Sequence, residues 1–275
     1  MAPVAELAAE LDLPLLKTSD VNSDESRAQL AATGAEVGMV CAFGQIIREP
    51  LLSDLTMLNV HPSLLPRWRG AAPIERAIMA GDAETGVCII ELESGLDSGP
   101  ILLSRRTAIG PDENYGELAV RLATIGGELA ADAIGSALEG SLNPVPQPGE
   151  GVTYAEKIDK RDRQLDPTLS AEELVRMVRA LDPHIGAHLS FDDGERLGIV
   201  EASALSSLPD LALEEGDVSG DLGELVAIGD QLILTCRLGW LRLDLVKPPG
   251  SRPMGSGDYL RGHRPPRHAI SPGAR

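Results

Sequence analysis

The chain is predicted to fold as an α/β domain with a mostly parallel sheet, followed by a small β-barrel domain. Through most of the first half, apolar segments of strand length alternate with helix-like segments, which is typical of an α/β layer structure. Residues 141–151 then contain three prolines and two glycines, as a linker does. Short alternating segments follow from residue 187 onward and indicate a barrel or compact sheet. We therefore expect a first domain at 1–142, a linker at 143–160 and a second domain at 161–275.

The first domain is predicted to contain helices and strands that end at recognisable signals. The segment 22–34 has helical spacing and stops at Gly34. The continuous apolar run 37–44 has strand length and is typical of a strand buried on both faces. Asn114 and Glu117 form a capping box that starts a long helix ending near residue 140. The remaining elements are helices at 3–11 and 71–81 and strands at 13–16, 57–60, 85–92 and 101–109.

The second domain is predicted to open with a helix and to continue as strands. Ser170 and Glu173 form a capping box for a helix at 170–181. Turn residues at 192–194 and 229–230 favour hairpins between neighbouring strands. The five predicted strands lie at 187–191, 196–202, 223–228, 231–238 and 240–246.

The composition argues against several classes of protein. The formal net charge is −18, so the chain as a whole is not an obvious nucleic-acid binder. Residues 237–275 differ, because they carry eight Lys/Arg side chains against only two acidic ones. This basic end is either a surface for phosphate contacts or a solvated charged tail. The three cysteines are far apart and do not indicate a disulfide framework.

Nothing in the sequence indicates a membrane span, secretion or a metal site. No apolar run is long enough to cross a bilayer, and the N-terminal segment lacks the basic start of a signal peptide. We therefore expect a cytoplasmic protein, and a monomer because no interface helix or coiled coil is evident. The five histidines show no metal-ligand spacing, and neither a glycine-rich nucleotide loop nor a nucleophile elbow is present.

The densest cluster of chemistry-bearing residues is the segment 59–70, which begins in a predicted strand. Asn59 and His61 are two apart, so strand alternation places both on one face, near the crevice where α/β sheets bind ligands. An Asn amide can donate to an oxygen that becomes negative, and a His can exchange a proton near neutral pH. Asp97 lies between two glycines in a loop joining two strands, from which it could orient His61. Taken singly, a His after a strand is more often a structural residue, and an Asp between glycines is more often a turn former.

Residues 59–102 closely resemble the superfamily of formyltransferases that use 10-formyltetrahydrofolate. The segments HPSLLP followed by a basic residue, RGAAPI, GDAETGV and GLDSG occur in the order and spacing of that family. The form RWRGAAPI, VTYAEKI at 152–158 and KPPGSRPMGSGDYLRG at 247–262 are most similar to members that formylate the methionine carried by initiator tRNA. The resemblance implies a Rossmann-like sheet in the first domain and an OB-like barrel in the second, which would bind tRNA.

The resemblance also implies roles for individual residues. Asn59, His61 and Asp97 match the catalytic trio of the family, in which Asp97 would hold His61 and raise its pKa. The co-substrate would be 10-formyltetrahydrofolate, the acceptor methionyl-initiator tRNA, and no cofactor would be tightly bound. The residues expected to line the folate pocket are Phe43, Gly44, Ser63, Leu64, Leu65 and Pro66. The residues expected to contact tRNA phosphates are Arg237, Arg242, Lys247, Arg252, Arg261 and Arg264.

The start of the chain departs from the family pattern. Family members begin with a β-α-β unit and a basic, glycine-rich loop, whereas residues 1–4 match the helix that follows that loop. The sequence therefore predicts a first domain that is incomplete at its N-terminus, with unpaired backbone groups and exposed apolar faces near 37–44. Two alternative functions stay open. One is formyl transfer to another amine, such as an amino-sugar nucleotide. The other is a truncated, non-catalytic relative that binds folate or tRNA.

Overall fold

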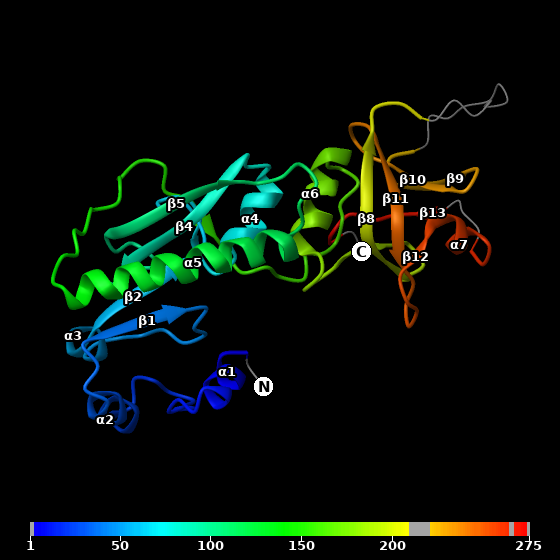
Figure 1. Ribbon diagram of the computed structural model, residues 1–275. Coiled ribbons are helices and arrows are strands. Elements are labelled where there is room, and N and C mark those ends of the chain that lie inside the picture. The colour runs from blue at the N-terminus through cyan, green and yellow to red at the C-terminus, as the bar shows by residue number, and fades with distance from the viewer. Residues whose placement is uncertain (1–2, 209–220, 264–266, 274–275) are drawn as a thin grey trace.

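The computed structural model describes residues 3–208, 221–263 and 267–273, which build an α/β part and a barrel-like part (Figure 1). Both predicted classes are confirmed. The α/β part contains α1 (Pro3–Glu10), α2 (Asp24–Ala32), β1 (Val37–Cys41), α3 (Leu51–Asp54), β2 (Thr56–His61), β3 (Arg69–Gly70), α4 (Pro73–Ala80), β4 (Glu84–Glu91), β5 (Ile101–Ala108) and α5 (Tyr115–Leu138). No helix within the described residues is long and apolar enough to cross a membrane.

The main sheet of the α/β part has the strand order β1-β2-β4-β5. β1 and β2 are parallel, whereas β4 is antiparallel to both β2 and β5. Among the described strands the sheet is therefore mixed rather than mostly parallel. For β4 and β5 the reason is local, because they are joined by a loop without a helix and only antiparallel neighbours allow so short a connection.

The sheet is covered on both faces, and strand alternation decides which side chains lie on which face. α5 lies along one face (Figure 1), where it packs on Leu58 of β2 and on Val87 and Ile89 of β4. Gly126 makes this approach possible, because a Cβ there would lie 2.9 Å from a methyl group of Val60. The side chains between these positions face the other way. Among them, Cys88 and Ile90 pack against Leu65.

Two expectations for the first 50 residues were wrong. The segment 13–16 forms no strand, and its leucines are exposed because no described strand pairs with it. The strand predicted at 37–44 ends at Cys41 and is not buried on both faces, since β1 is the edge of the sheet. Cys41 is exposed at the end of this strand, whereas Cys88 and Cys236 are buried. The short helix α3 was not predicted.

The barrel-like part begins with a helix that connects it to the α/β part. α6 packs on both α4 and β8, and its predicted Ser170–Glu173 capping box is present. A sheet with antiparallel pairings then follows, in the order β13-β9-β10-β11-β8-β7. Its elements are α6 (Ala171–Leu181), β7 (Ala187–Ser190), β8 (Arg196–Leu205), β9 (Glu224–Ile228), β10 (Gln231–Thr235), β11 (Trp240–Lys247), β12 (Met254–Gly255), α7 (Ser256–Leu260) and β13 (Arg267–His268).

The two outer strands of this sheet meet and close it into a barrel. Beyond the end of β13, Ala269 forms a bridge with Phe191, and the Ile270 N–H donates to the Ser190 carbonyl at 2.9 Å. The interior is filled by leucine, isoleucine and valine side chains around Phe191. The hairpin predicted at 229–230 is confirmed, and Gly229 supplies the positive φ that such a tight turn requires.

The segment predicted as a linker is ordered against the α/β part. β6 (Tyr154–Ala155) pairs in parallel with β3, and Val145 forms a bridge with Ile101. Farther along, Arg76 of α4 donates to both carboxylate oxygens of Asp162, at 3.0 and 2.8 Å. The connection between the two parts is therefore packed against the α/β part, next to the residues described in the following subsection.

Candidate active site

His61 is the last residue of β2 and lies almost completely buried at the end of the sheet. Its Nε2–H donates to the Trp68 carbonyl at 2.9 Å, which fixes the ring and assigns that nitrogen its proton. Its other ring nitrogen, Nδ1, lies 3.6 Å from Oδ2 of Asp97. The side chain is only 4% exposed and that of Asp97 is 14% exposed. The two groups thus face each other in a largely water-excluded place, and Asp97 lies where it could orient His61.

Asp97 reaches His61 because the loop between β4 and β5 runs along the sheet. Leu92, where the loop begins, donates its N–H to the carbonyl of Met57, one end of β2. Asp97 lies beside the other end of β2, and its Oδ2 also accepts the Gly70 N–H at 2.8 Å. Asp97 has a φ of 45°, a left-handed conformation that side-chain-bearing residues adopt at a cost of about 1 kcal/mol or more.

The pKa of His61 is lowered, chiefly because burial disfavours the charged imidazolium. Asp97 raises it, in the direction expected, and so does the contact with the Trp68 carbonyl, but burial outweighs both. The expectation that Asp97 would set a raised pKa was therefore wrong in its net direction. A neutral His61 with an unprotonated Nδ1 can accept a proton, and Asp97 can stabilise the cation that results.

Asn59 lies two residues before His61 on β2, on the face opposite α5. Its side chain is half-buried, and no group among the described residues hydrogen-bonds its amide. The amide N–H₂ is therefore available to a ligand, and donors of this kind stabilise a developing oxyanion.

The Asp82 carboxylate holds one part of the segment 62–70, which lies between β2 and α4. Asp82 accepts from Arg67 Nε at 2.8 Å and Nη2 at 2.7 Å, and from Trp68 Nε1 at 2.8 Å. Within the loop, the Ser63 hydroxyl donates to the Arg67 carbonyl at 2.6 Å. This network fixes the Trp68 carbonyl that orients His61. Asp82 was not singled out from the sequence, where an Asp beside a glycine looks like any turn residue.

Replacing Asp82 by asparagine is expected to lower the free energy of unfolding at pH 7 by about 1.5–3 kcal/mol, the usual worth of hydrogen bonds to a charged group. Burial alone would raise the Asp82 pKa, but the bonds from Arg67 and Trp68 outweigh it and the pKa is lowered. A lowered pKa stabilises the fold above the unfolded value near 4, and this stability is lost as the pH falls through the folded value.

The difference between wild type and Asp82→Asn should therefore shrink from pH 7 to pH 3, as measured by urea denaturation. Asp132→Asn, a change of equal charge at an exposed residue of α5 that makes no hydrogen bond or ion pair within the described residues, is the control and should leave stability unchanged at both values. A difference that stayed constant with pH would mean that the Asp82 charge contributes nothing.

Two groups of the 143–160 segment complete the site, and the sequence did not indicate either. The Thr153 hydroxyl accepts the Trp68 N–H at 2.9 Å. The Gln147 amide lies between Arg69 and the loop that carries Asp97. The prolines and glycines around Gln147 are typical of a flexible connection, and such a composition does not predict that one of its side chains makes fixed contacts.

Of the residues predicted to line a folate pocket, some are accessible and others are buried. Leu64 and Pro66 are half-buried, whereas Ser63 and Leu65 are buried and shape the loop from within. Phe43 is 45% exposed just beyond the end of β1, and a Cβ on Gly44 would meet nothing within 4 Å. Because β1 and β2 are parallel, residues after Cys41 lie at the same edge of the sheet as His61.

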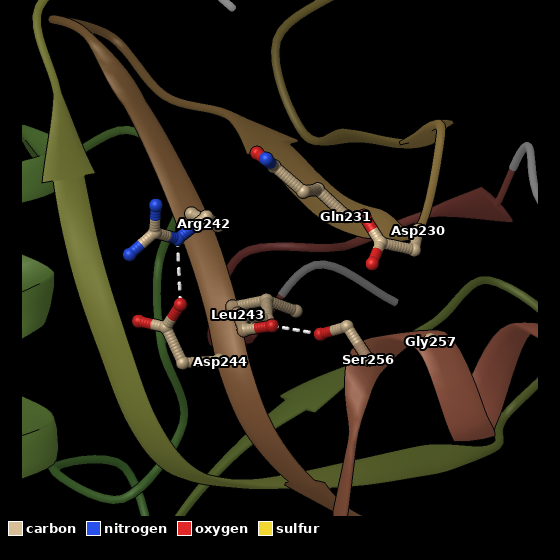
Figure 2. A pocket seen from close by; sticks show the side chains of 7 residues that line it. All are labelled: Asp230, Gln231, Arg242, Leu243, Asp244, Ser256 and Gly257. Atoms are coloured by element: carbon tan, nitrogen blue, oxygen red, sulfur yellow. Dashed lines mark hydrogen bonds and ion pairs between the residues drawn. The ribbon is translucent and has the colours of Figure 1, made fainter.

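The residues predicted to contact tRNA phosphates are placed in different surroundings. Arg242 lies beside a cavity of about 300 Å³ on the barrel, where its Nε donates to Asp244 at 2.6 Å (Figure 2). Arg261 pairs with Asp258, and Arg237 Nη2 lies 3.7 Å from Glu173. Lys247 and Arg252 are exposed, and Arg264 lies outside the described residues. The three paired arginines would have to exchange their carboxylate partners for phosphates.

The site contains no activated nucleophile and no metal cluster within the described residues. Cys88 is the strand neighbour of His61, but burial raises the pKa of its thiol to about 11. No group of three His, Cys, Asp or Glu side chains in that part of the chain could hold a metal ion.

Two family profiles match nearly the whole chain. The profile described as formyl transferase matches residues 2–134, and the one described as formyl transferase, C-terminal domain, matches residues 157–264. The chain thus has the fold of a formyl transferase.

Similarity to curated relatives shows which group of formyl transferases the chain belongs to. The methionyl-tRNA formyltransferase of Cereibacter sphaeroides is 42% identical over 271 residues, which are 98% of this chain and 84% of the relative. That of Xanthomonas campestris pv. campestris is 42% identical over 96% of this chain and 84% of its own length. The chain belongs to the methionyl-tRNA formyltransferase family.

Solved structures share the fold at lower identity. HypX from Aquifex aeolicus superimposes over 95% of this chain with a TM-score of 0.66 at 18% identity, and the chain spans 47% of that protein. An N-formyltransferase from Helicobacter canadensis gives a TM-score of 0.55 at 14% identity, over 73% of this chain and 70% of its own. At these identities the similarity describes the fold alone.

Proposed function

We propose that this protein transfers the formyl group of 10-formyltetrahydrofolate to the α-amino group of methionyl-initiator tRNA. The proposal rests on the His61–Asp97 pair at the carboxyl end of β2, together with the Asn59 amide, which has no hydrogen-bond partner among the described residues. The curated relatives named as methionyl-tRNA formyltransferases support the choice of acceptor. The protein would act as a monomer in the cytoplasm.

In the proposed reaction, the amine nitrogen attacks the formyl carbon and the formyl oxygen becomes negative. The Asn59 amide donates to that oxygen as its charge develops. Nδ1 of His61 takes the proton that the amine loses, and Asp97 stabilises the resulting imidazolium. The bond between the formyl carbon and N10 of the folate then breaks, and the proton passes from His61 to N10. Formyl-methionyl-tRNA and tetrahydrofolate are the products.

We propose that the folate contacts the accessible residues at this end of the sheet, which are Phe43, Gly44, Leu64 and Pro66. The buried Ser63 and Leu65 would shape the same pocket from within the loop. The exposed Lys247 and Arg252 are the simplest of the proposed tRNA contacts. A phosphate contact there would make binding weaker as the salt concentration rises.

The test is formylation of methionyl-initiator tRNA by the purified chain, supplied with 10-formyltetrahydrofolate. The expected result is formyl-methionyl-tRNA together with one tetrahydrofolate per formyl group. An amino-sugar nucleotide should not be formylated in a parallel reaction. Transfer to the sugar amine but not to the tRNA would overturn the proposed acceptor. Folate binding without transfer to either would favour a non-catalytic relative.

A further inference from the structure

Gln147 uses both ends of its side-chain amide to join two loops of the site. Its Oε1 accepts from Arg69 Nε at 3.1 Å and from Arg69 Nη2 at 2.7 Å. Its Nε2 donates to the Asp97 carbonyl and to the Gly99 carbonyl, both at 2.8 Å. Four hydrogen bonds thus connect one residue of the 143–160 segment to both loops.

The partners allow only one orientation of this amide. Guanidinium groups only donate hydrogen bonds and carbonyl oxygens only accept them. Turning the amide over would place N–H₂ against the Arg69 donors and an oxygen against two carbonyl oxygens. All four bonds would be lost. Gln147 therefore holds the two loops with its oxygen toward Arg69 and its nitrogen toward the Asp97 loop. No other standard side chain of the same length and shape has an acceptor on one side and a donor on the other.

The contacts lie directly beside the one that places Asp97 against His61. Gly70, the neighbour of Arg69, donates its N–H to the Asp97 carboxylate at 2.8 Å. The Asp97 backbone is held by Gln147 and its carboxylate by Gly70, so the residue is fixed at two points. Its left-handed φ of 45° is unfavourable in a free loop and needs such support.

We propose that Gln147 is a positioning residue for formyl transfer, which holds Asp97 in reach of His61 without touching either substrate. The inference rests on the proposed function. On this proposal, the segment 143–160 that connects the two parts of the protein also helps to place Asp97 for catalysis. Replacing Gln147 should therefore alter the placement of Asp97 first and the rate of transfer as a consequence.

The structural arm of the test does not depend on activity. Amide hydrogen exchange of Gly70 and of the loop 94–100 is measured in wild type, Gln147→Leu and Gln164→Leu. Gln164 donates to the Ile270 carbonyl at 2.8 Å in the barrel-like part and is the matched control. We expect faster exchange of Gly70 and the loop only in Gln147→Leu. Unchanged exchange there would overturn the inference, even if the protein formylated nothing.

The kinetic arm separates positioning from binding. In Gln147→Leu we expect kcat to fall about 10–100-fold, as displacements of about 1 Å near a reacting centre do. KM for both substrates should stay within about threefold, since no substrate contact is removed. Gln147→Glu keeps an acceptor for Arg69 but faces two carbonyls with a carboxylate, so it should be at least as impaired. Wild-type rates in Gln147→Glu would show that the Asp97 side of the contact is unimportant.

A double-mutant cycle identifies the group through which Gln147 acts. In an Asp97→Asn background, Gln147→Leu should have almost no further effect on kcat, because Asp97 no longer contributes. Effects that multiplied in the double variant would overturn the proposed route through Asp97. Thermal unfolding of each variant establishes that it is folded at the assay temperature. Absence of wild-type activity would instead count against the proposed function.

Discussion

Replacing His61 by glutamine is expected to lower kcat for formyl transfer by about 10²–10⁴-fold, the usual contribution of a positioned acid or base. Glutamine can still donate to the Trp68 carbonyl, which now accepts from His61 at 2.9 Å, so the loop 62–70 should keep its shape. It cannot accept a proton at neutral pH. The loss should therefore fall on kcat and leave folate binding, measured by fluorescence titration, nearly intact.

His188 provides a matched control for this substitution. Burial lowers its pKa as well, and it lies on β7 of the barrel-like part. His188→Gln should retain the wild-type rate, whereas His61→Ala should resemble His61→Gln in kcat and unfold more easily. Wild-type turnover in His61→Gln would show that His61 does not act as the base. A large loss of folate affinity would show instead that His61 contacts the ligand mainly as a binding residue.

Replacing Asn59 by alanine is expected to lower kcat by about 10²–10³-fold, as removal of one oxyanion donor does. The Asn59 amide makes no hydrogen bond within the described residues, so alanine breaks no hydrogen bond among them. Asn59→Asp should be more damaging, because a carboxylate of the same shape repels the oxygen that becomes negative. The measurement is single-turnover formylation at saturating substrate.

The control for charge is Asn143→Asp at an exposed position of the 143–160 segment. It should retain the wild-type rate. If Asn59→Ala and Asn59→Asp had equal, small effects, the amide would be a structural group and another donor would have to stabilise the oxyanion. Combining Asn59→Ala with His61→Gln should produce less than the product of the two effects, since both act on one transition state.

The sequence predicted the elements whose signals are local. The capping boxes at Asn114 and Ser170 were confirmed with both of their reciprocal hydrogen bonds, because each needs only residues three apart. The hairpin at 229–230 was found for the same reason. Asn59 and His61 were assigned to one face of a strand by alternation alone, and the proximity of Asp97 followed from the family resemblance.

Features that depend on distant partners were not predicted. The run 13–16 has strand composition, but a strand needs a neighbour to pair with and none of the described strands provides one. The net direction of the His61 pKa depends on how deeply the ring is buried, which a strand pattern does not reveal. Gln147 and Thr153 contact residues about 50 to 85 positions away, so no local signal identifies them.

The pairing of β6 with β3 changes where the catalytic part can be separated from the rest. A fragment cut at residue 142, where composition changes, would retain Asn59, His61 and Asp97 but lose the strand at 154–155. The Ala71 N–H, which donates to the Ala155 carbonyl at 2.9 Å, would lose its acceptor, and so would the Trp68 N–H. Any exchange of C-terminal modules between relatives should therefore place its junction after Ala155, because the structural border of the active site lies there.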